Sequence, residues 1–333
     1  RRIFAIFEAI RRNWPIEDIA ELSKIDIWFL IEIEKSFNVN PESTPTTILK
    51  MLGWTDEDLD NKDSKKELEN NRVYKLVDTC SAEFVSKTPY LYSTNGTSND
   101  DTATKQKKVV VIGSGPNRIG QGIEFDYCCV QAVFGLKESG YKTIMVNCNP
   151  ETVSTDFDIA DRLYFEPLTF EDVMNIVDLE NPDGVLVQFG GQTPLNIAKR
   201  LKDAGVKIIG TSPDAIDLAE NRNKFGKILD DLNIPVPKWG TAFSVDEALV
   251  VAHDVGYPVL VRPSYVLGGR GMEIVYDDNG LKTYVSKAAL VSGEHPILVD
   301  AFLEDAFEFD VDALCDGSDV FVAGIMQHIE EAG

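Results

Sequence analysis

A run of β-branched residues ends at a glycine-rich loop, and a helical pattern begins directly after it, within residues 108–127. This order is typical of a ligand-facing turn at the carboxyl edge of a parallel sheet. The loop does not match the dinucleotide-binding fingerprint, because Arg118 occupies the position of the third glycine after the GSG at 113–115. Glycine returns only at Gly120 and Gly122. The sequence therefore predicts a parallel α/β domain, and it argues against a dehydrogenase.

Strand and helix patterns continue to alternate as far as residue 210, which indicates a parallel sheet flanked by helices. The loops that follow three of the strands, at 113–122, 147–156 and 189–193, are rich in Gly, Asn, Gln, Pro and Thr. Such loops present backbone and amide groups to a ligand, although the same composition also suits packing turns. We expect strands at 109–112, 143–146, 185–188 and 207–209, and helices at 123–139, 170–179 and 194–204.

The segment before this domain follows a helical pattern. Apolar residues recur at helical spacing, and the residues up to about Tyr92 are expected to be helical. Pro15 is expected to open the second helix. The third helix, at 27–37, has so many apolar residues that it should be buried between neighbours or in an interface. Ser, Thr, Asn and Asp dominate 93–106, which predicts a linker.

The segment after this domain has another pattern, which predicts mainly antiparallel strands. Its first part, 213–232, is expected to be helical. A strand, a glycine loop and a second strand are expected within 257–275, and further strands at 297–300, 309–315 and 320–325.

Composition excludes several classes of protein. The formal net charge of −23 argues against nucleic acid as the main partner, because phosphate backbones need a basic face. No apolar run is long enough to cross a bilayer, and no secretion signal is recognisable. The five cysteines lack zinc-type spacing and fit reduced thiols, and the three histidines have no partners at triad or metal spacing. We therefore expect a cytoplasmic protein that binds no membrane. The chain begins without methionine, and we expect it to be a piece of a longer polypeptide.

Charged residues near the second glycine loop are candidates for nucleotide binding. A glycine loop between antiparallel strands can close over phosphates through its backbone N–H groups. Arg262 before the loop and Arg270 within it could hold phosphate oxygens through their forked guanidinium groups. Glu308 could accept hydrogen bonds from a ribose or an adenine. Each of the three could instead form a surface ion pair, and Arg222 alone would be an ordinary solvated arginine.

Five motifs together resemble the large chain of carbamoyl phosphate synthetase, in that family's order. The helical segment extends the resemblance through IDIWFL at 25–30 and VYKLVDTCSAEF at 73–84. The five motifs are GSGPNRIGQGIEFDY at 113–127, NCNPETVSTD at 147–156, QFGGQTP at 188–194, IGTSPD at 209–214 and RPSYVLGGR at 262–270.

The resemblance implies a mixed fold, in which an all-α segment precedes two domains. Residues 1–92 are similar to the C-terminal part of the family's oligomerisation domain, and 93–106 would be a linker. Residues 107–211 resemble the α/β pre-ATP-grasp domain, with a Rossmann-like parallel sheet, of the second synthetase half. Residues 212–333 resemble the first part of the matching α+β ATP-grasp domain. The region between Phe37 and Arg72 has no clear match, so the resemblance does not specify the structure of 38–72.

The resemblance also implies an ATP-dependent ligase. In this family the first half makes carbamate from bicarbonate, ATP and ammonia supplied by a glutaminase subunit or domain. The second half phosphorylates carbamate with a second ATP and Mg²⁺ or Mn²⁺, giving carbamoyl phosphate for pyrimidine or arginine synthesis. Implied partners are the glutaminase, the first half, an allosteric domain and a second copy bound through the helical segment. The metal ligands would lie beyond Gly333, so we expect this chain alone to make no carbamoyl phosphate.

Site residues follow from the same resemblance, position by position. Arg222 and Arg262 are similar to ATP-binding arginines, with Arg262 also acting on the transferred phosphoryl group. Leu303 and Glu308 correspond to residues around the nucleotide. Gly268, Gly269 and Arg270 belong to the glycine loop. A further four residues resemble the wall of an internal passage that delivers carbamate from the first half, namely Arg118, Gly122, Glu124 and Glu151.

Two other functions are kept as alternatives. Biotin carboxylase or another ATP-grasp ligase would share the architecture, but the NPET and PNRIGQG loops disfavour it. The second alternative is a non-catalytic assembly module, in which the helical segment associates and the α/β part is a scaffold.

Overall fold

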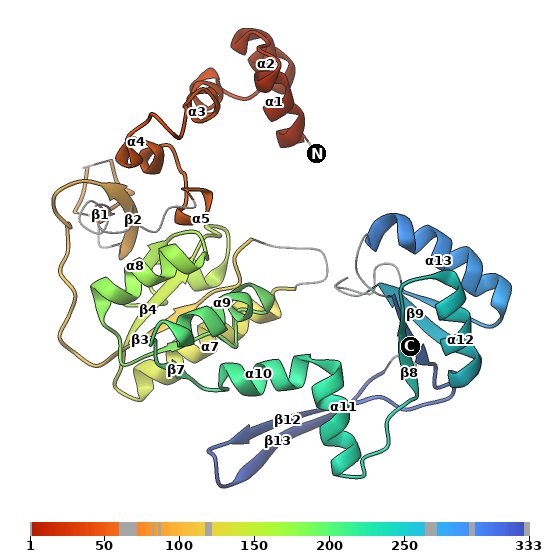
Figure 1. Ribbon diagram of the computed structural model, residues 1–333. Coiled ribbons are helices and arrows are strands. Elements are labelled where there is room, and N and C mark those ends of the chain that lie inside the picture. Colours follow the sequence, from red (N-terminus) through yellow and green to blue (C-terminus); the bar gives the residue numbers. More distant parts are fainter. Residues whose placement is uncertain are drawn as a thin grey trace. The chain divides into compact units, whose positions relative to one another are not determined.

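The computed structural model describes residues 2–59, 72–81, 83–85, 88–116, 122–263, 272–292 and 297–329, with the backbone alone described at 56–57, 222–223, 263 and 287–292. Figure 1 shows the elements, which form a mixed α/β protein with a mostly parallel sheet. The chain divides into two compact units at about residue 216, and Gly122 is grouped with the second.

Helices form the start of the first unit, as predicted. They are α1 (Arg2–Arg11), α2 (Ile16–Ser23), α3 (Ile27–Phe37), α4 (Thr46–Met51) and the short α5 (Asp56–Leu59). Pro15 lies at the N-cap of α2, and Asp26 caps α3 by accepting a hydrogen bond from the Trp28 N–H at 2.8 Å. A small core joins the first three helices, formed by Ile6, Ile10, Ile16, Ile19 and Leu30.

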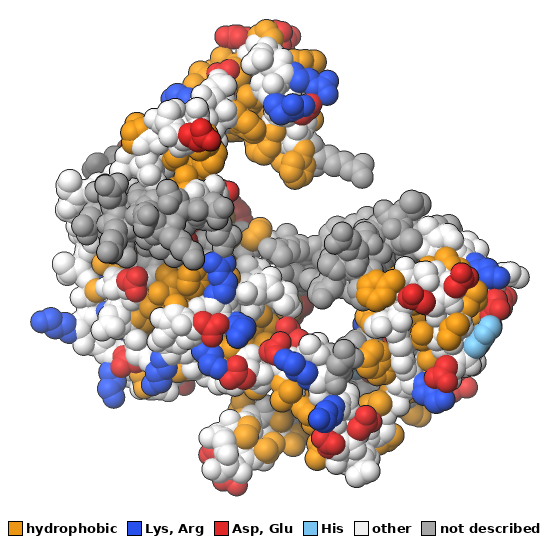
Figure 2. Space-filling view, in the orientation of Figure 1, with side chains coloured by type: hydrophobic (Ala, Val, Ile, Leu, Met, Phe, Trp, Pro, Cys, Tyr) orange, Lys and Arg blue, Asp and Glu red, His pale blue; other side chains and the backbone are white. Residues whose placement is uncertain are grey.

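The apolar surface of α3 is mostly exposed among the described residues. Only Leu30 is buried, whereas Trp28 and Phe29 expose more than half of their surface. Of the two alternatives predicted for α3, burial between neighbouring helices is therefore wrong, because α1 and α2 cover only one side. Burial in an interface stays a prediction. Figure 2 shows hydrophobic side chains at the surface of these helices.

Two strands replace the helix predicted near Tyr92. β1 (Arg72–Leu76) pairs antiparallel with β2 (Tyr90–Asn95). The prediction of helix up to Tyr92 is wrong here, because Val73, Tyr74 and Leu91 are buried where this hairpin joins the central sheet. Long-range pairing therefore outweighs the local pattern.

The predicted linker is part of the first unit and is hydrogen-bonded to its strands. β2 extends into it, and the Asn99 side chain accepts a hydrogen bond from the Tyr74 N–H at 2.7 Å. Arg162 pairs with Asp101 at 2.9 Å and donates to the Thr102 carbonyl at 2.9 Å. Side-chain contacts thus fix the segment that leads into β3 (Lys108–Ile112). The predicted domain boundaries, at 92, 106 and 211, stay predictions.

The central sheet has the order β1-β2-β5-β4-β3-β6-β7 and is parallel from β2 onward. The four predicted strands are confirmed, although the third and the fourth are shorter than predicted, and β5 is an addition that the sequence did not predict. The strands after the hairpin are β3 (Lys108–Ile112), β4 (Lys142–Asn147), β5 (Arg162–Phe165), β6 (Gly184–Leu186) and β7 (Ile208–Ile209).

Helices cover both faces of this sheet, which explains its continuous apolar strands. α8 (Phe170–Glu180) and α9 (Gln192–Asp203) pack on the face that carries Val110 and Ile112. α7 (Glu124–Glu138) packs on the face that carries Val109 and Val111. The three predicted helices of this domain are therefore confirmed.

The second unit is built on antiparallel strands, as predicted. The helix expected at 213–232 divides into α10 (Pro213–Glu220) and α11 (Arg222–Asp231), because Asn221 is extended and its side chain accepts the Lys224 N–H at 3.1 Å. A four-stranded sheet follows in the order β10-β9-β11-β8, and a separate hairpin joins β12 to β13. Its elements are β8 (Trp239–Ala242), α12 (Val245–Val255), β9 (Val259–Pro263), β10 (Glu273–Val275), α13 (Asp278–Ser292), β11 (Ile297–Ala301), β12 (Phe309–Cys315) and β13 (Val320–Gln327).

The two faces of the four-stranded sheet differ in their cover. Val259 and Val261 of β9 and Val299 of β11 are buried in the core with α12 and α13. The alternate residues Leu260, Arg262, Leu298 and Asp300 point to the opposite face and are half-buried. This second face carries the one predicted nucleotide-binding arginine whose side chain is among the described residues.

Candidate functional site

Loops at the carboxyl ends of β3 and β4 meet around one buried amide. The Asn147 side chain is fully buried, and its oxygen accepts the Gly115 N–H at 3.0 Å and the Cys148 N–H at 2.9 Å. Its amide nitrogen donates to the Ser154 hydroxyl at 3.1 Å. Asn147 therefore fixes the start of the first glycine loop and both ends of the NPET loop.

The start of α7 is tied to the same group of loops. The Asp126 carboxylate, 3% exposed, accepts the Ser154 N–H at 3.0 Å through Oδ2. Ser154 lies in a 3₁₀ turn, Val153–Thr155, that follows the NPET motif. One chain of hydrogen bonds thus runs from α7 through the 3₁₀ turn and Asn147 to Gly115.

Two glycines make this packing possible. A β-carbon added at Gly113 would lie 2.5 Å from the Asn147 side chain. At Gly190 it would lie 2.5 Å from the Gly113 carbonyl oxygen and 2.7 Å from that of Ile112. The loops after β3 and β6 therefore approach each other so closely that backbone faces backbone.

The loop after β7 is held by a glutamine. Gln188 follows β6, and its side-chain oxygen accepts the Thr211 N–H at 2.5 Å. Gly210, with φ of +85°, leaves room for that side chain, since an added β-carbon would collide with it. The side-chain amides of Asn147 and Gln188 thus bind the backbone of neighbouring loops.

Two of the predicted passage residues lie on this framework. Glu124 is the first residue of α7, and Glu151 lies within the NPET loop, where its N–H donates to the Asn149 side chain at 3.0 Å. Both side chains are exposed. Gly122 is also exposed, and Arg118 lies outside the described residues.

Arg262 occupies the second face of the four-stranded sheet. Its Nε donates to the Asp300 carboxylate at 3.2 Å, diagonally across from β9 to β11. The side chains keep 35% and 17% of their surface exposed, respectively. The ion pair orients the guanidinium group without burying it, so an anion could still reach the arginine.

Of the other residues predicted for the nucleotide site, the structure describes only some side chains. Leu303 follows β11 and is exposed. Glu308 precedes β12, where its backbone carbonyl accepts the His328 N–H at 2.9 Å and its carboxylate lies 3.8 Å from Nδ1 of that histidine. Arg222 begins α11 and only its backbone is described, while Gly268, Gly269 and Arg270 lie outside the described residues.

Four polar residues of these sites were not predicted individually. Asn147 and Ser154 belong to a quoted motif, but nothing in the motif says which amide is buried. Asp126 follows the glycine loop in the first turn of a helix, where an acidic residue is common for local reasons. Asp300 ends a predicted strand, and its role arises only from the pairing of β11 with β9.

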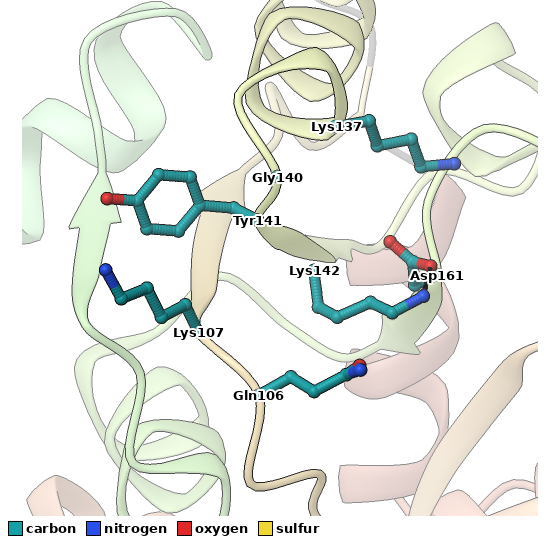
Figure 3. Close-up of a pocket in the computed structure, with 7 residues that line it drawn as sticks. All are labelled: Gln106, Lys107, Lys137, Gly140, Tyr141, Lys142 and Asp161. Carbon is teal, nitrogen blue, oxygen red and sulfur yellow. Dashed lines mark hydrogen bonds and ion pairs between the residues drawn. The ribbon is translucent and has the colours of Figure 1, made fainter.

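A surface hollow lies at the opposite, amino edge of the first sheet. It encloses about 610 Å³ and none of the predicted site residues lines it. In Figure 3, Lys107 and the Tyr141 hydroxyl lie on one side, whereas Lys142 extends toward Asp161 on the other side, where Lys137 also lies. Lys142 pairs with Asp161 at 2.7 Å, and Lys137 donates to the Ile159 carbonyl. Because the ammonium groups diverge, the hollow does not form an anion site.

The residues that the structure describes contain no group of three or more His, Cys, Asp or Glu that could hold a metal ion. None of their helices is both long and apolar enough to span a membrane.

Comparison with solved structures shows an ATP-grasp fold. The structure is similar to a biotin carboxylase from Campylobacter jejuni, with a TM-score of 0.52 and 20% identity, over 66% of this chain and 50% of that one. At this identity the likeness shows the fold alone.

Family comparison identifies the chain more closely. Its three segments match the carbamoyl phosphate synthetase large chain oligomerisation domain at 1–80, the carbamoyl phosphate synthase preATP-grasp domain at 105–218 and the carbamoyl phosphate synthase L chain ATP binding domain at 221–329. The chain belongs to the carbamoyl phosphate synthase large-chain family.

Curated relatives match along all or nearly all of the chain. The large chain from Archaeoglobus fulgidus is 55% identical over 355 residues, which cover 100% of this chain and 33% of the relative. The large chain from Acidobacterium capsulatum is 54% identical over 354 residues, 98% of this chain and 32% of the relative. The chain thus spans about a third of the length of these relatives.

Proposed function

We propose that the whole protein is an ATP-dependent ligase that phosphorylates carbamate to carbamoyl phosphate, and that this chain supplies part of the second half. The observation that carries the proposal is the ordered match of all three segments to one family, at 50–55% identity to the curated relatives. The ammonia would come from a glutaminase partner, and the product would serve pyrimidine or arginine synthesis.

Among the arginines whose side chains the structure describes, Arg262 is the one we assign to the nucleotide. Its guanidinium group lies on the face of the sheet opposite α12 and α13, at the end of the strand that enters the RPSYVLGGR loop. Asp300 holds it at 3.2 Å through Nε, which favours one orientation of the planar fork. A phosphate group bound there would have its charge partly neutralised during phosphoryl transfer.

Magnesium or manganese bound with ATP would neutralise part of the phosphate charge during phosphoryl transfer. The described part of this chain offers no cluster of carboxylates for it. The family resemblance alone supports our assignment of its ligands to a part of the protein outside this chain. On this view the chain alone makes no carbamoyl phosphate.

Glu124 and Glu151 would line a passage for carbamate. Both are exposed carboxylates on loops that Asn147, Asp126 and Ser154 hold in place. A walled polar route would protect carbamate from water before the second phosphorylation. Helices α1–α3, with Trp28 and Phe29 exposed, would mediate association with a second copy.

The test uses the full-length enzyme in the reverse direction. ADP and carbamoyl phosphate give ATP and carbamate at the second site, so this reaction needs no glutaminase or first half. We expect Arg262→Ala to lower its rate by about a hundredfold or more, as expected when one group that stabilises the transferred charge is removed.

The control for this test is Lys199→Ala. Lys199 is an exposed cation on α9 that pairs with Asp203 of the same helix at 3.5 Å, so its loss removes one positive charge from an element that carries no predicted nucleotide-binding residue. We expect the rate of ATP formation to stay unchanged in this variant. A wild-type enzyme that makes no ATP, or an Arg262→Ala variant as fast as wild type, would contradict the proposal.

A further inference from the structure

Asp126 has contacts that a local helix cap would not have. It is the third residue of α7, where an acidic side chain usually interacts with the N–H groups of its own helix. Here Oδ2 accepts instead from Ser154, 28 residues further along the chain, at 3.0 Å. The carboxylate therefore joins two separate segments of the first unit.

The segments that it joins are those that carry the two glutamates of the proposed passage. Glu124 lies two residues before Asp126, and Glu151 lies three residues before Ser154. Other bonds stiffen the second segment, since Thr155 donates to the Asn149 carbonyl at 3.0 Å and Ser154 accepts from Asn147 at 3.1 Å. The hydrogen bond between Asp126 and Ser154 joins this turn to α7.

The buried position of Asp126 is unfavourable for a carboxylate whose only role is to fill space. Asp126 is 3% exposed, and its Oδ1 has no hydrogen-bond partner among the residues that the structure describes. No described lysine or arginine forms an ion pair with it either. A buried charge without full pairing is unfavourable, although the N-terminus of α7 offsets part of the cost.

We propose that Asp126 is a positioning residue that sets Glu151 relative to Glu124 along the carbamate passage. The inference rests on the proposed function. Losing the carboxylate would release the 3₁₀ turn from α7 while leaving both glutamates in the chain. Carbamate would then escape during transfer, whereas the second active site would still work.

The experiment compares two reactions of the full-length enzyme. The first is carbamoyl phosphate formed per ATP hydrolysed when glutamine and bicarbonate are the substrates, which requires the passage. The second is ATP formed from ADP and carbamoyl phosphate, which requires only the second site. We expect Asp126→Ala to lower the first ratio by about tenfold, the scale of a small misplacement of substrate-guiding groups, and to change the second rate by less than about twofold.

Two further variants separate positioning from folding. Asp126→Asn keeps an oxygen that can accept the Ser154 N–H, and should restore most of the ratio. Asp161→Asn is the matched control, since Asp161 also accepts a backbone N–H, from Thr143 at 2.9 Å, but at the other edge of the sheet. It should leave both reactions near the wild-type level.

The outcomes distinguish this inference from the proposed function. An unchanged ratio in Asp126→Ala overturns the positioning role, as does an equal fall of both reactions in Asp126→Ala and Asp126→Asn. If the wild-type enzyme makes no ATP from carbamoyl phosphate, the proposed function itself is wrong.

Discussion

The two candidate sites hold their polar groups in opposite ways. In the first unit, Asn147, Asp126 and Gln188 are used mainly to bond the backbone of neighbouring loops. In the second unit, Arg262 and Asp300 pair with each other on a half-buried sheet face. The first arrangement suits a rigid wall, since buried hydrogen bonds specify one geometry. The second suits a site that must exchange a charged ligand with water.

Breaking the backbone contact in the first unit should have the largest effect. We expect Gly190→Ala to destabilise the chain by about 3 kcal/mol or more, since the new methyl group would overlap two carbonyl oxygens that cannot turn away. Gly135→Ala is the control, because that glycine is inside α7 with open space around it, and it should stabilise by about 0.5–1 kcal/mol. Thermal unfolding measures both. A mild effect of Gly190→Ala would mean that the loops have room to separate.

Removing the buried side-chain amide of Asn147 should have the second largest effect on stability. We expect Asn147→Ala to cost about 2–3 kcal/mol, because the Gly115 and Cys148 N–H groups lose their acceptor in a buried place. Hydrogen exchange at β3 and β4 would report the loss locally. Asn149→Ala, which removes the acceptor of the Glu151 N–H from a half-buried position, should cost about 1 kcal/mol or less. Equal costs at the two positions would show that Asn147 is not the centre of this framework.

Much of the fold was predictable because its signals are local. β3 and β4 are continuous apolar runs with glycine or asparagine at their ends, and α7 starts where the glycines stop. β5 was missed because its four residues begin with Arg162 and its strand character depends on neighbours on both sides. The β1–β2 hairpin was missed for the same reason, since its place is set by pairing with β5.

The site was predictable only to the level of motifs. Residues were assigned to the passage and the nucleotide site through resemblance, whereas the contacts that hold them come from distant parts of the chain. Asp126 and Ser154 are 28 residues apart, and Arg262 and Asp300 are 38 residues apart. No periodicity in the sequence encodes such pairs.

Acid should weaken the amino edge of the first sheet. Burial tends to raise the pKa of Asp161, but hydrogen bonds from Lys142 and Thr143 outweigh it, so the pKa lies below the ordinary value. Its contribution to stability is therefore present above the unfolded pKa of about 3.9 and is lost as the pH falls below it. The difference in unfolding free energy between wild type and Asp161→Asn should be constant from about pH 7 to about pH 5 and shrink toward about pH 3. Urea titrations at each pH would measure it, and a difference that grows on acidification would contradict the assignment.

The smallest effect on stability is expected at the second face of the four-stranded sheet. Asp300→Asn should change the free energy of unfolding by only about 0.5 kcal/mol, because the pair with Arg262 is partly exposed and screened by solvent. Hydrogen exchange of β9 and β11 would measure this locally, with Val299→Ala in the buried core as the contrasting variant at about 2 kcal/mol. If Asp300→Asn lowered the free energy of unfolding as much as Asn147→Ala, the two sites would not differ in how firmly they hold their polar groups. Arg262 would then be a structural residue, and its assignment to the nucleotide would lose its physical basis.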